Sequence, residues 1–197
     1  MIRLGIFASG NGSNVENIFK FIKTKKLHDH NRVDSMVIGM VFINNKNAYV
    51  VNRCKLLNIP YLIIDDDFMN NGKLLKVLKE QNIDFIILSG FLKKIPYSII
   101  NIYNKKIINI HPSLLPKYGG KGMYGMNVHK EVIKNKENYS GISIHYVNEE
   151  YDKGDIIYRV RQRISSNETP ESLYNKIKIL EYKWYPLIIH SLILKLN

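Results

Sequence analysis

The sequence is almost without cysteine, because Cys54 is the only one among its 197 residues. A single thiol cannot form an internal disulfide or a thiolate zinc site, so we expect a reducing compartment, the cytoplasm, and no chemistry based on cysteine. The chain also lacks a run of about 18 apolar residues and has no basic segment followed by an apolar one at its start. We therefore expect neither a secretion signal nor a membrane span.

Acidic residues are scarce relative to basic ones: 17 Asp and Glu stand against 29 Lys and Arg, for a formal net charge of +12. A basic surface can bind nucleic acid, but the lysines are spread along the whole chain and no nucleic-acid-binding motif accompanies them. We therefore expect small anionic substrates rather than nucleic acid or a membrane. The composition leaves open a monomer or a homodimer.

Short apolar and β-branched runs alternate with helical patterns through the first half of the chain. The runs are typical of strands buried on both faces of a sheet. The expected strands are Ile2–Ala8, Met36–Ile43, Tyr61–Ile64, Phe85–Ser89 and Lys106–Ile110. Between them, apolar residues recur at helical spacing from Val15 to Ile22, from Val50 to Leu57 and from Leu74 to Leu78. This alternation predicts a parallel sheet with right-handed crossovers.

The pattern changes after Ile110. A loop rich in Pro and Gly runs over 111–125, and a helix near Val128–Lys134 and two strands, Ile142–Val147 and Ile156–Ile164, follow it. We expect an α/β, Rossmann-like, mostly parallel sheet flanked by helices, with an antiparallel C-terminal extension. No linker or repeat interrupts the chain, so residues 1–197 are expected to form a single domain.

A long helix should close the chain. Thr169, Pro170 and Glu171 have the form of an N-cap, a first-turn proline and an acid that the helix dipole favours. Pro186 lies further along and should kink this helix.

The segment Ser9–Asn14 reads Ser-Gly-Asn-Gly-Ser-Asn where a strand should end and a helix begin. Free backbone N–H groups and the helix dipole favour an anion there, and a phosphate is the natural occupant. The alternative is that Ser13 and Glu16 merely form a capping box, and both interpretations can hold together. Because Val15 replaces the third glycine of a dinucleotide fingerprint and no Gly-Lys-Ser/Thr follows, a nicotinamide site and a P-loop are disfavoured.

Side chains alternate between the two faces of a strand, so Asn109 and His111 lie on the same side of the last parallel strand as it ends. Their side chains should emerge at the edge of the sheet where the first strand leads into the glycine loop, Ser9–Asn14. A lone His beside Pro112 is more often structural, but an amide NH2 and an imidazolium together form a donor pair for a carbonyl oxygen that becomes negative. This pair indicates acyl or formyl transfer.

Asp152 lies between the last two expected strands and could return a carboxylate to His111. The alternative is that Asp152 and Gly154 only form a turn. His28 and His30 lie in a polar connection without an obvious third ligand, so we expect no metal.

Four motifs in order resemble the folate-dependent phosphoribosylglycinamide formyltransferase family of purine synthesis. They are Ser9–Asn14, Leu88–Leu92, the string Asn-Ile-His-Pro-Ser-Leu-Leu-Pro-Lys-Tyr over 109–118, and Asp152-x-Gly154. The resemblance covers essentially the whole chain and implies the formyltransferase fold. It also implies transfer of the formyl group of 10-formyltetrahydrofolate, a co-substrate, to the amine of 5'-phosphoribosylglycinamide.

The resemblance implies a role for each matching residue. Asn109 and His111 would stabilise the oxyanion, and Asp152 would orient His111 and raise its pKa. The implied substrate-binding residues are Gly12, Ser13, Asn14, Gly90, Pro112 and Glu181. The implied folate-binding residues are Phe91, Leu92, Lys93, Lys94, Ile95, Asn109 and Tyr151. Within the first group, residues 12–14 would hold the phosphate and Glu181 the amine end.

Some positions depart from the family. Asp67 and Lys93 stand where Arg is common, and Arg159 stands where Gln usually follows the Asp-x-Gly turn. The stretch Gly119–Gly125 differs from the shorter loop of some relatives, and we hypothesise that it is a mobile lid. Whether Leu115–Pro116 is cis stays open.

Two alternatives to the main function remain. The chain could be a non-catalytic nucleotide- or RNA-binding module, or a formyltransferase that acts on another amine. Superfamily members with an additional RNA-binding or regulatory domain are expected to be longer than this chain.

Overall fold

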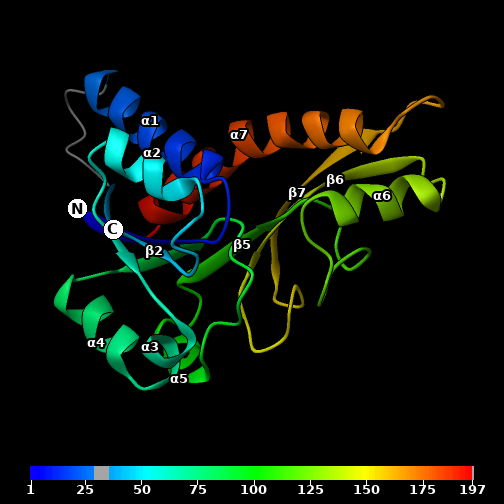
Figure 1. The fold of residues 1–197 in the computed structure, drawn as a ribbon. Coiled ribbons are helices and arrows are strands. Elements are labelled where there is room, and N and C mark those ends of the chain that lie inside the picture. The colour runs from blue at the N-terminus through cyan, green and yellow to red at the C-terminus, as the bar shows by residue number, and fades with distance from the viewer. Residues whose placement is uncertain (29–35, 197) are drawn as a thin grey trace.

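The computed structural model describes residues 1–28 and 36–196 and is built around one seven-stranded sheet (Figure 1). The strand order is β3-β2-β1-β4-β5-β6-β7. The strands are β1 (Ile2–Ala8), β2 (Met36–Ile43), β3 (Tyr61–Ile63), β4 (Phe85–Leu88), β5 (Ile107–His111), β6 (Tyr139–Tyr146) and β7 (Ile156–Arg163). The first five run parallel, whereas β6 is antiparallel to β5 and β7 is antiparallel to β6. The predicted fold class is thereby confirmed.

Helices cover both faces of the sheet, as Figure 1 shows. They are α1 (Ser13–His28), α2 (Val50–Leu56), α3 (Asp66–Asn70), α4 (Lys73–Glu80), α5 (Tyr97–Ile102), α6 (Met126–Lys134) and α7 (Pro170–Leu194). Buried residues of α1, α2, α6 and α7 share one hydrophobic cluster, and those of α3, α4 and α5 share the other. None of the described helices is long and apolar enough to cross a membrane.

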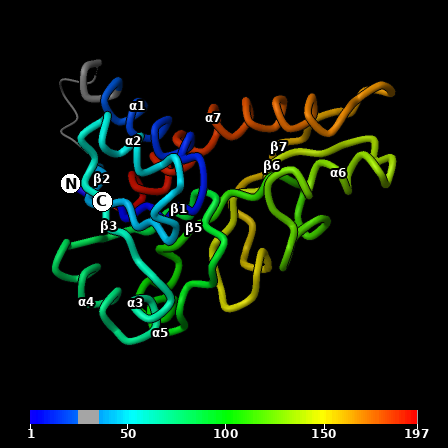
Figure 2. Tube along the Cα trace, in the orientation of Figure 1, coloured from blue at the N-terminus to red at the C-terminus, as the bar shows by residue number. Residues whose placement is uncertain are grey.

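The central strands are apolar on both sides because both of their faces are covered. In β1, Leu4 and Ile6 belong to the cluster under α1 and α7, whereas Phe7 belongs to the opposite one. All three side chains are fully buried. Figure 2 traces the chain from β5 through the following loop to α6, and back along β6 and β7.

Two short helices, α3 and α5, are absent from the sequence-based expectation. They contain five and six residues, which is too short for an apolar repeat to show. Asp65 caps α3 by accepting a hydrogen bond from the Phe68 N–H. A capping residue is therefore the only local signal that could have revealed α3.

The start of α7 is as predicted. Thr169 accepts a hydrogen bond from the Ser172 N–H, and Ser172 Oγ accepts one from the Thr169 N–H, which completes a capping box. The helix continues through Pro186, and the kink there stays a prediction. Leu115–Pro116, the bond left open above, is cis.

The fold brings the ends of β1 and β4 together at one edge of the sheet. From β1 the sheet grows to β2 on one side and to β4 on the other, so the crevice beyond these strands is a topological switch point. The Ser9 N–H donates to the Gly90 carbonyl, and the Leu92 N–H donates to Ser9 Oγ. These bonds join the glycine loop to the segment after β4, and both then line the same crevice.

Candidate active site

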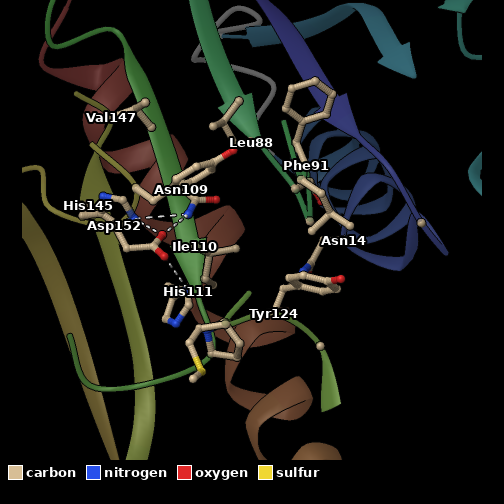
Figure 3. Close-up of a pocket in the computed structure, with 18 of the residues that line it drawn as sticks. Asn14, Leu88, Phe91, Asn109, Ile110, His111, Tyr124, His145, Val147 and Asp152 are labelled. Carbon is tan, nitrogen blue, oxygen red and sulfur yellow. Dashed lines mark hydrogen bonds and ion pairs between the residues drawn. The ribbon is translucent and has the colours of Figure 1, made fainter. Parts of the chain in front are cut away.

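One cavity of about 650 Å³ opens at this edge of the sheet (Figure 3). Every residue to which the sequence assigns a catalytic or binding role lines it. The lining comes from the glycine loop, the 88–95 segment, the end of β5, the 120–125 loop, the 147–152 turn and α7. The topology thus gathers segments that are far apart in the sequence.

Asn109, His111 and Asp152 meet at the centre of this cavity. His111 Nδ1 lies 3.5 Å from Asp152 Oδ2, and Asn109 Nδ2 lies 3.4 Å from Asp152 Oδ1. Figure 3 shows the carboxylate of Asp152 facing both side chains. The predicted approach of Asp152 to His111 is therefore present.

The imidazole of His111 is buried, and both its nitrogens have partners. Nε2 lies 2.7 Å from the carbonyl oxygen of Tyr118, while Nδ1 faces Asp152. Burial lowers the pKa of His111 below its ordinary value, although the Asp152 carboxylate and the Tyr118 carbonyl both raise it. Asp152 thus raises the pKa of His111 as predicted, but desolvation outweighs the carboxylate and the net pKa is lowered.

His145 is a member of this cluster that sequence reasoning missed. On β6 it lies directly opposite Asn109 in the antiparallel register, and its Nε2 is 3.2 Å from Asn109 Nδ2 and 3.6 Å from Asp152 Oδ1. His145 Nδ1 lies 2.8 Å from the Tyr146 carbonyl, an acceptor that fixes the proton on Nδ1 in the neutral ring. Nε2 can then accept from the Asn109 amide. His145 could have been found only from the register of β6 on β5, and no local sequence pattern specifies that register.

Asp152 is held by its turn as well as by the histidines. Its φ is 58°, and its Oδ2 accepts a 2.8 Å hydrogen bond from the Gly120 N–H. A Cβ on Gly154 would lie 1.8 Å from the Tyr146 carbonyl oxygen, so only glycine fits there. The predicted turn is therefore present, and it is this turn that carries Asp152 to His111.

The charge of Asp152 follows from these contacts. Burial by itself raises the pKa of Asp152, but the hydrogen bond with His145, the charge of His111 and the Gly120 N–H together lower it below its usual value. The carboxylate is thus ionised and can compensate a positive charge on a neighbouring imidazole.

The glycine loop and α7 form one end of the cavity. Asn14 Nδ2 donates a 2.9 Å hydrogen bond to Glu181 Oε2, and burial raises the pKa of Glu181 to about 7. Asn14 Oδ1 is buried without a hydrogen-bond partner among the described residues. This end offers the N-terminus of α1, an unsatisfied acceptor and a carboxyl group that is easily protonated.

The capping-box interpretation of Ser13 and Glu16 is wrong. The helix already includes Ser13, and the Glu16 N–H donates to the Gly12 carbonyl. The Glu16 carboxylate instead pairs with Arg53 and Lys20. The reason is tertiary, because α2 presents Arg53 to this carboxylate.

The segment after β4 forms the apolar wall of the other end. Phe91 and Ile95 are buried, and the ring of Phe91 packs edge-on against Phe7 at 5.2 Å between centroids. They therefore support the wall, while Leu92 is exposed at 45%. Lys93 pairs with Asp66 at 2.9 Å.

Two further lysines line the cavity, Lys94 near the apolar wall and Lys178 at the end formed by the glycine loop and α7. Lys94 Nζ lies 5.4 Å from the centre of the Tyr151 ring. Lys178 on α7 lines the cavity one turn before Glu181, over the rings of Tyr174 and Tyr182.

Sequence reasoning missed further lining residues, among them Tyr124, His129, Tyr174 and Lys178. Of these, the spacing of Lys178 and Glu181 along the final helix was the only available signal. The sequence predicted no metal at His28 and His30. Because His30 lies outside the described residues, this remains a prediction. Arg159, a departure from the family pattern, donates to the Leu115 carbonyl at 2.6 Å.

Comparisons with known proteins agree with this geometry. The family model described as formyl transferase matches residues 2–189. The chain is 31% identical to phosphoribosylglycinamide formyltransferase of Bacillus subtilis (strain 168), over 98% of this chain and 95% of the relative. The crystal structure of phosphoribosylglycinamide formyltransferase from Bacillus Halodurans superposes with a TM-score of 0.83 at 31% identity, covering 99% of this chain and 97% of that one.

A plant relative is longer. The chloroplastic phosphoribosylglycinamide formyltransferase of Arabidopsis thaliana is 36% identical over 96% of this chain, which spans 65% of that relative's length. The chain spans 60% of the similar protein of Vigna unguiculata. The match to the family model covers nearly all of the chain, and the chain therefore belongs to the formyl transferase family.

Proposed function

We propose that this protein transfers the formyl group of 10-formyltetrahydrofolate to the amine of 5'-phosphoribosylglycinamide. The observation that supports it most is the meeting of Asn109, His111 and Asp152 in one cavity, between a glycine loop and an apolar wall. The products are formylglycinamide ribonucleotide and tetrahydrofolate. The names of the relatives match this reaction.

The phosphate end of the ribonucleotide lies, in this proposal, on the backbone of Gly12, Ser13 and Asn14. The N-terminus of α1 favours an anion at this place. Glu181 then faces the glycinamide end, and Gly90 and Pro112 border the path between the two ends. Substrate is stretched from the start of α1 towards the end of β5.

The folate fits the opposite wall. Leu92 offers exposed apolar surface, and Lys93, Lys94 and Tyr151 stand around it, supported by the buried Phe91 and Ile95. An apolar slot with a few polar groups is what a flat heterocycle requires. The folate supplies the formyl group, and Asn109 lies where both substrates meet.

In the reaction, a bond forms between the substrate nitrogen and the formyl carbon while the bond from that carbon to the folate nitrogen breaks. The proton that leaves the amine ends on the folate nitrogen, through water. Asn109 and His111 donate hydrogen bonds to the formyl oxygen as negative charge develops on it. Since Asn109 Nδ2 now makes a long 3.4 Å contact with Asp152, the formyl oxygen can take over this N–H at little cost.

His111 must also turn one N–H towards the substrate. Its Nε2 now lies 2.7 Å from the Tyr118 carbonyl, so this N–H is shared with the formyl oxygen or released by a shift of residues 118–120. Asp152 compensates the positive charge that His111 gains when it is protonated. We further propose that the chain works in the cytoplasm as a single domain on small molecules.

The test is a direct assay of the purified chain. It is mixed with 10-formyltetrahydrofolate and glycinamide ribonucleotide, and both formylated product and released tetrahydrofolate are followed. An analogue without the amine is the control and should give no product. Tetrahydrofolate release that is independent of the amine would indicate a hydrolase instead.

The variants Asn109→Ala, His111→Ala and Asp152→Asn test the residue roles. Asn109→Ala and His111→Ala should each lower turnover by about 10² to 10³, the usual cost of losing an oxyanion donor. Asp152→Asn should also lower turnover severely, because it removes the carboxylate that orients His111 and compensates its charge. Thermal melting by circular dichroism should show that each variant is folded. Near-normal formyl transfer by His111→Ala would refute its assigned role.

A further inference from the structure

Arg53, on α2, holds the glycine loop from behind. Its Nε donates to the Asn11 carbonyl at 2.9 Å, and its Nη2 donates to Asn11 Oδ1 at 2.8 Å. The guanidinium thus grips both the main chain and the side chain of one loop residue, with the fixed geometry of a planar fork. Asn11 comes directly before Gly12, where the loop lines the cavity.

The first turn of α2 makes two more contacts with the same loop. The Val50 N–H donates to the Gly10 carbonyl at 3.2 Å. Gly12 has a φ of +74°, and a Cβ there would lie 2.4 Å from Val50 Cγ2. Residues 10, 11 and 12 are each fixed by α2, so the backbone N–H groups that follow are fixed before any ligand binds.

Arg53 also controls the charge beside the loop. Its Nη1 pairs with Glu16, a first-turn residue of α1 whose other oxygen lies 2.6 Å from Lys20 Nζ. The side chains of Arg53 and Glu16 are exposed at only 23% and 22%, so water screens this pair less than a surface pair. Without Arg53, the carboxylate of Glu16 would stand close to the expected phosphate and would keep Lys20 as its ion-pair partner among the described residues.

We propose that Arg53 is a positioning residue for the substrate phosphate. It does not touch the phosphate; it acts through Asn11, by shaping the loop, and through Glu16, by neutralising a carboxylate near the start of α1. This inference rests on the function proposed above, because it takes the glycine loop as the phosphate site. It predicts a defect in ribonucleotide binding that spares the folate and the chemical step.

The experiment compares Arg53→Met with Lys55→Met in the formyl transfer assay. Lys55 is an exposed residue of the same helix, so its variant loses the same charge without touching the loop. Arg53→Met should raise KM for glycinamide ribonucleotide about tenfold or more, because hydrogen bonds from a charged group are lost. KM for the folate and kcat at saturating ribonucleotide should stay within about twofold of the wild type, as should all constants of Lys55→Met.

Two more variants separate charge from shape. Arg53→Lys keeps the charge but cannot grip Asn11 at two points, so its KM for the ribonucleotide should lie between those of wild type and Arg53→Met. Adding Glu16→Gln to Arg53→Met should restore part of the affinity by removing the unpaired carboxylate. Arg53→Lys also serves as the test if Arg53→Met does not fold, as judged by thermal melting.

The proposal is wrong if an unimpaired KM for the ribonucleotide accompanies loss of Arg53, or if KM for the folate rises by the same factor. Absence of formyl transfer by the wild-type chain is a different result. It would remove the proposed function, and this inference with it, whereas normal transfer with an unaffected Arg53→Met would remove the inference alone.

Discussion

At the scale of single residues, the buried carboxylate of Glu181 lowers the stability of the folded protein at high pH although it lines the candidate site. It is held by the amide of Asn14, and desolvation raises its pKa from the ordinary value of 4.5 to about 7. Between these two pH values the folded state binds more protons than the unfolded state. Stability from this group is therefore complete below about pH 4.5 and is lost as pH rises through about 7.

Replacing Glu181 with Gln should stabilise the unliganded protein above pH 7, because the amide keeps an acceptor for Asn14 without a buried charge. The melting temperature at pH 8 should rise, whereas at pH 4.5 wild type and variant should melt alike. KM for glycinamide ribonucleotide should rise at the same time, since the proposed binding mode places this carboxylate at the amine end of the substrate. A variant less stable than wild type at pH 8 would contradict the assigned cost of burial.

At the scale of elements, α6 carries a buried histidine in the wall of the cavity. His129 is 1% exposed, packs edge-on against Tyr174 and has no hydrogen-bond partner on Nδ1 among the described residues. Burial, assisted by the positive potential of His111, lowers the pKa of His129 to about 4. The unfolded chain therefore binds more protons between about pH 4 and 6.5, and stability falls as pH falls through this window.

His129→Phe should reduce the loss of stability as pH falls, because Phe keeps an aromatic ring against Tyr174 and cannot be protonated. Melting temperatures of wild type and variant are measured from pH 7.5 down to pH 4. The drop in melting temperature should be smaller for the variant, with pH 7.5 as the reference where His129 is neutral in both states. Parallel curves would mean that His129 is not a source of acid sensitivity.

For the molecule as a whole, the net charge of +12 is compatible with a nucleic acid or with a small anionic substrate as the partner. The salt dependence of binding separates these two classes. A protein that neutralises many phosphates of a nucleic acid loses affinity steeply with salt, whereas a ligand with one phosphate does not. Its positive field should attract the anionic ribonucleotide without making the complex strongly dependent on salt.

The Kd of glycinamide ribonucleotide should change by less than about tenfold between about 50 and 200 mM salt, whereas 6 to 10 contacts to nucleic acid would cost about 10³ to 10⁵. Isothermal titration calorimetry at several salt concentrations measures this slope, with a single-stranded RNA as the comparison ligand. Tight RNA binding with a steep slope would favour the RNA-binding alternative.

Local patterns along the chain were sufficient to predict the parallel strands, the cap of α7 and the placement of Asn109 and His111 on one side of β5. Apolar runs, capping residues and the period of two along a strand are properties of neighbouring residues, so they can be read before folding. Asn109 and His111 could be paired in this way. For Asp152 the sequence offered a carboxylate that could reach His111 or a simple turn, and the family resemblance favoured the carboxylate.

Contacts between distant segments were decided by the tertiary structure alone. The register of β6 on β5 places His145 against Asn109, and the packing of α2 brings Arg53 to Asn11 and Glu16, which removes the capping box. Burial likewise lowers the pKa of His111 and outweighs the raising effect of Asp152 that the sequence predicted. Register, packing and desolvation depend on which surfaces meet in three dimensions, and no stretch of sequence contains that information by itself.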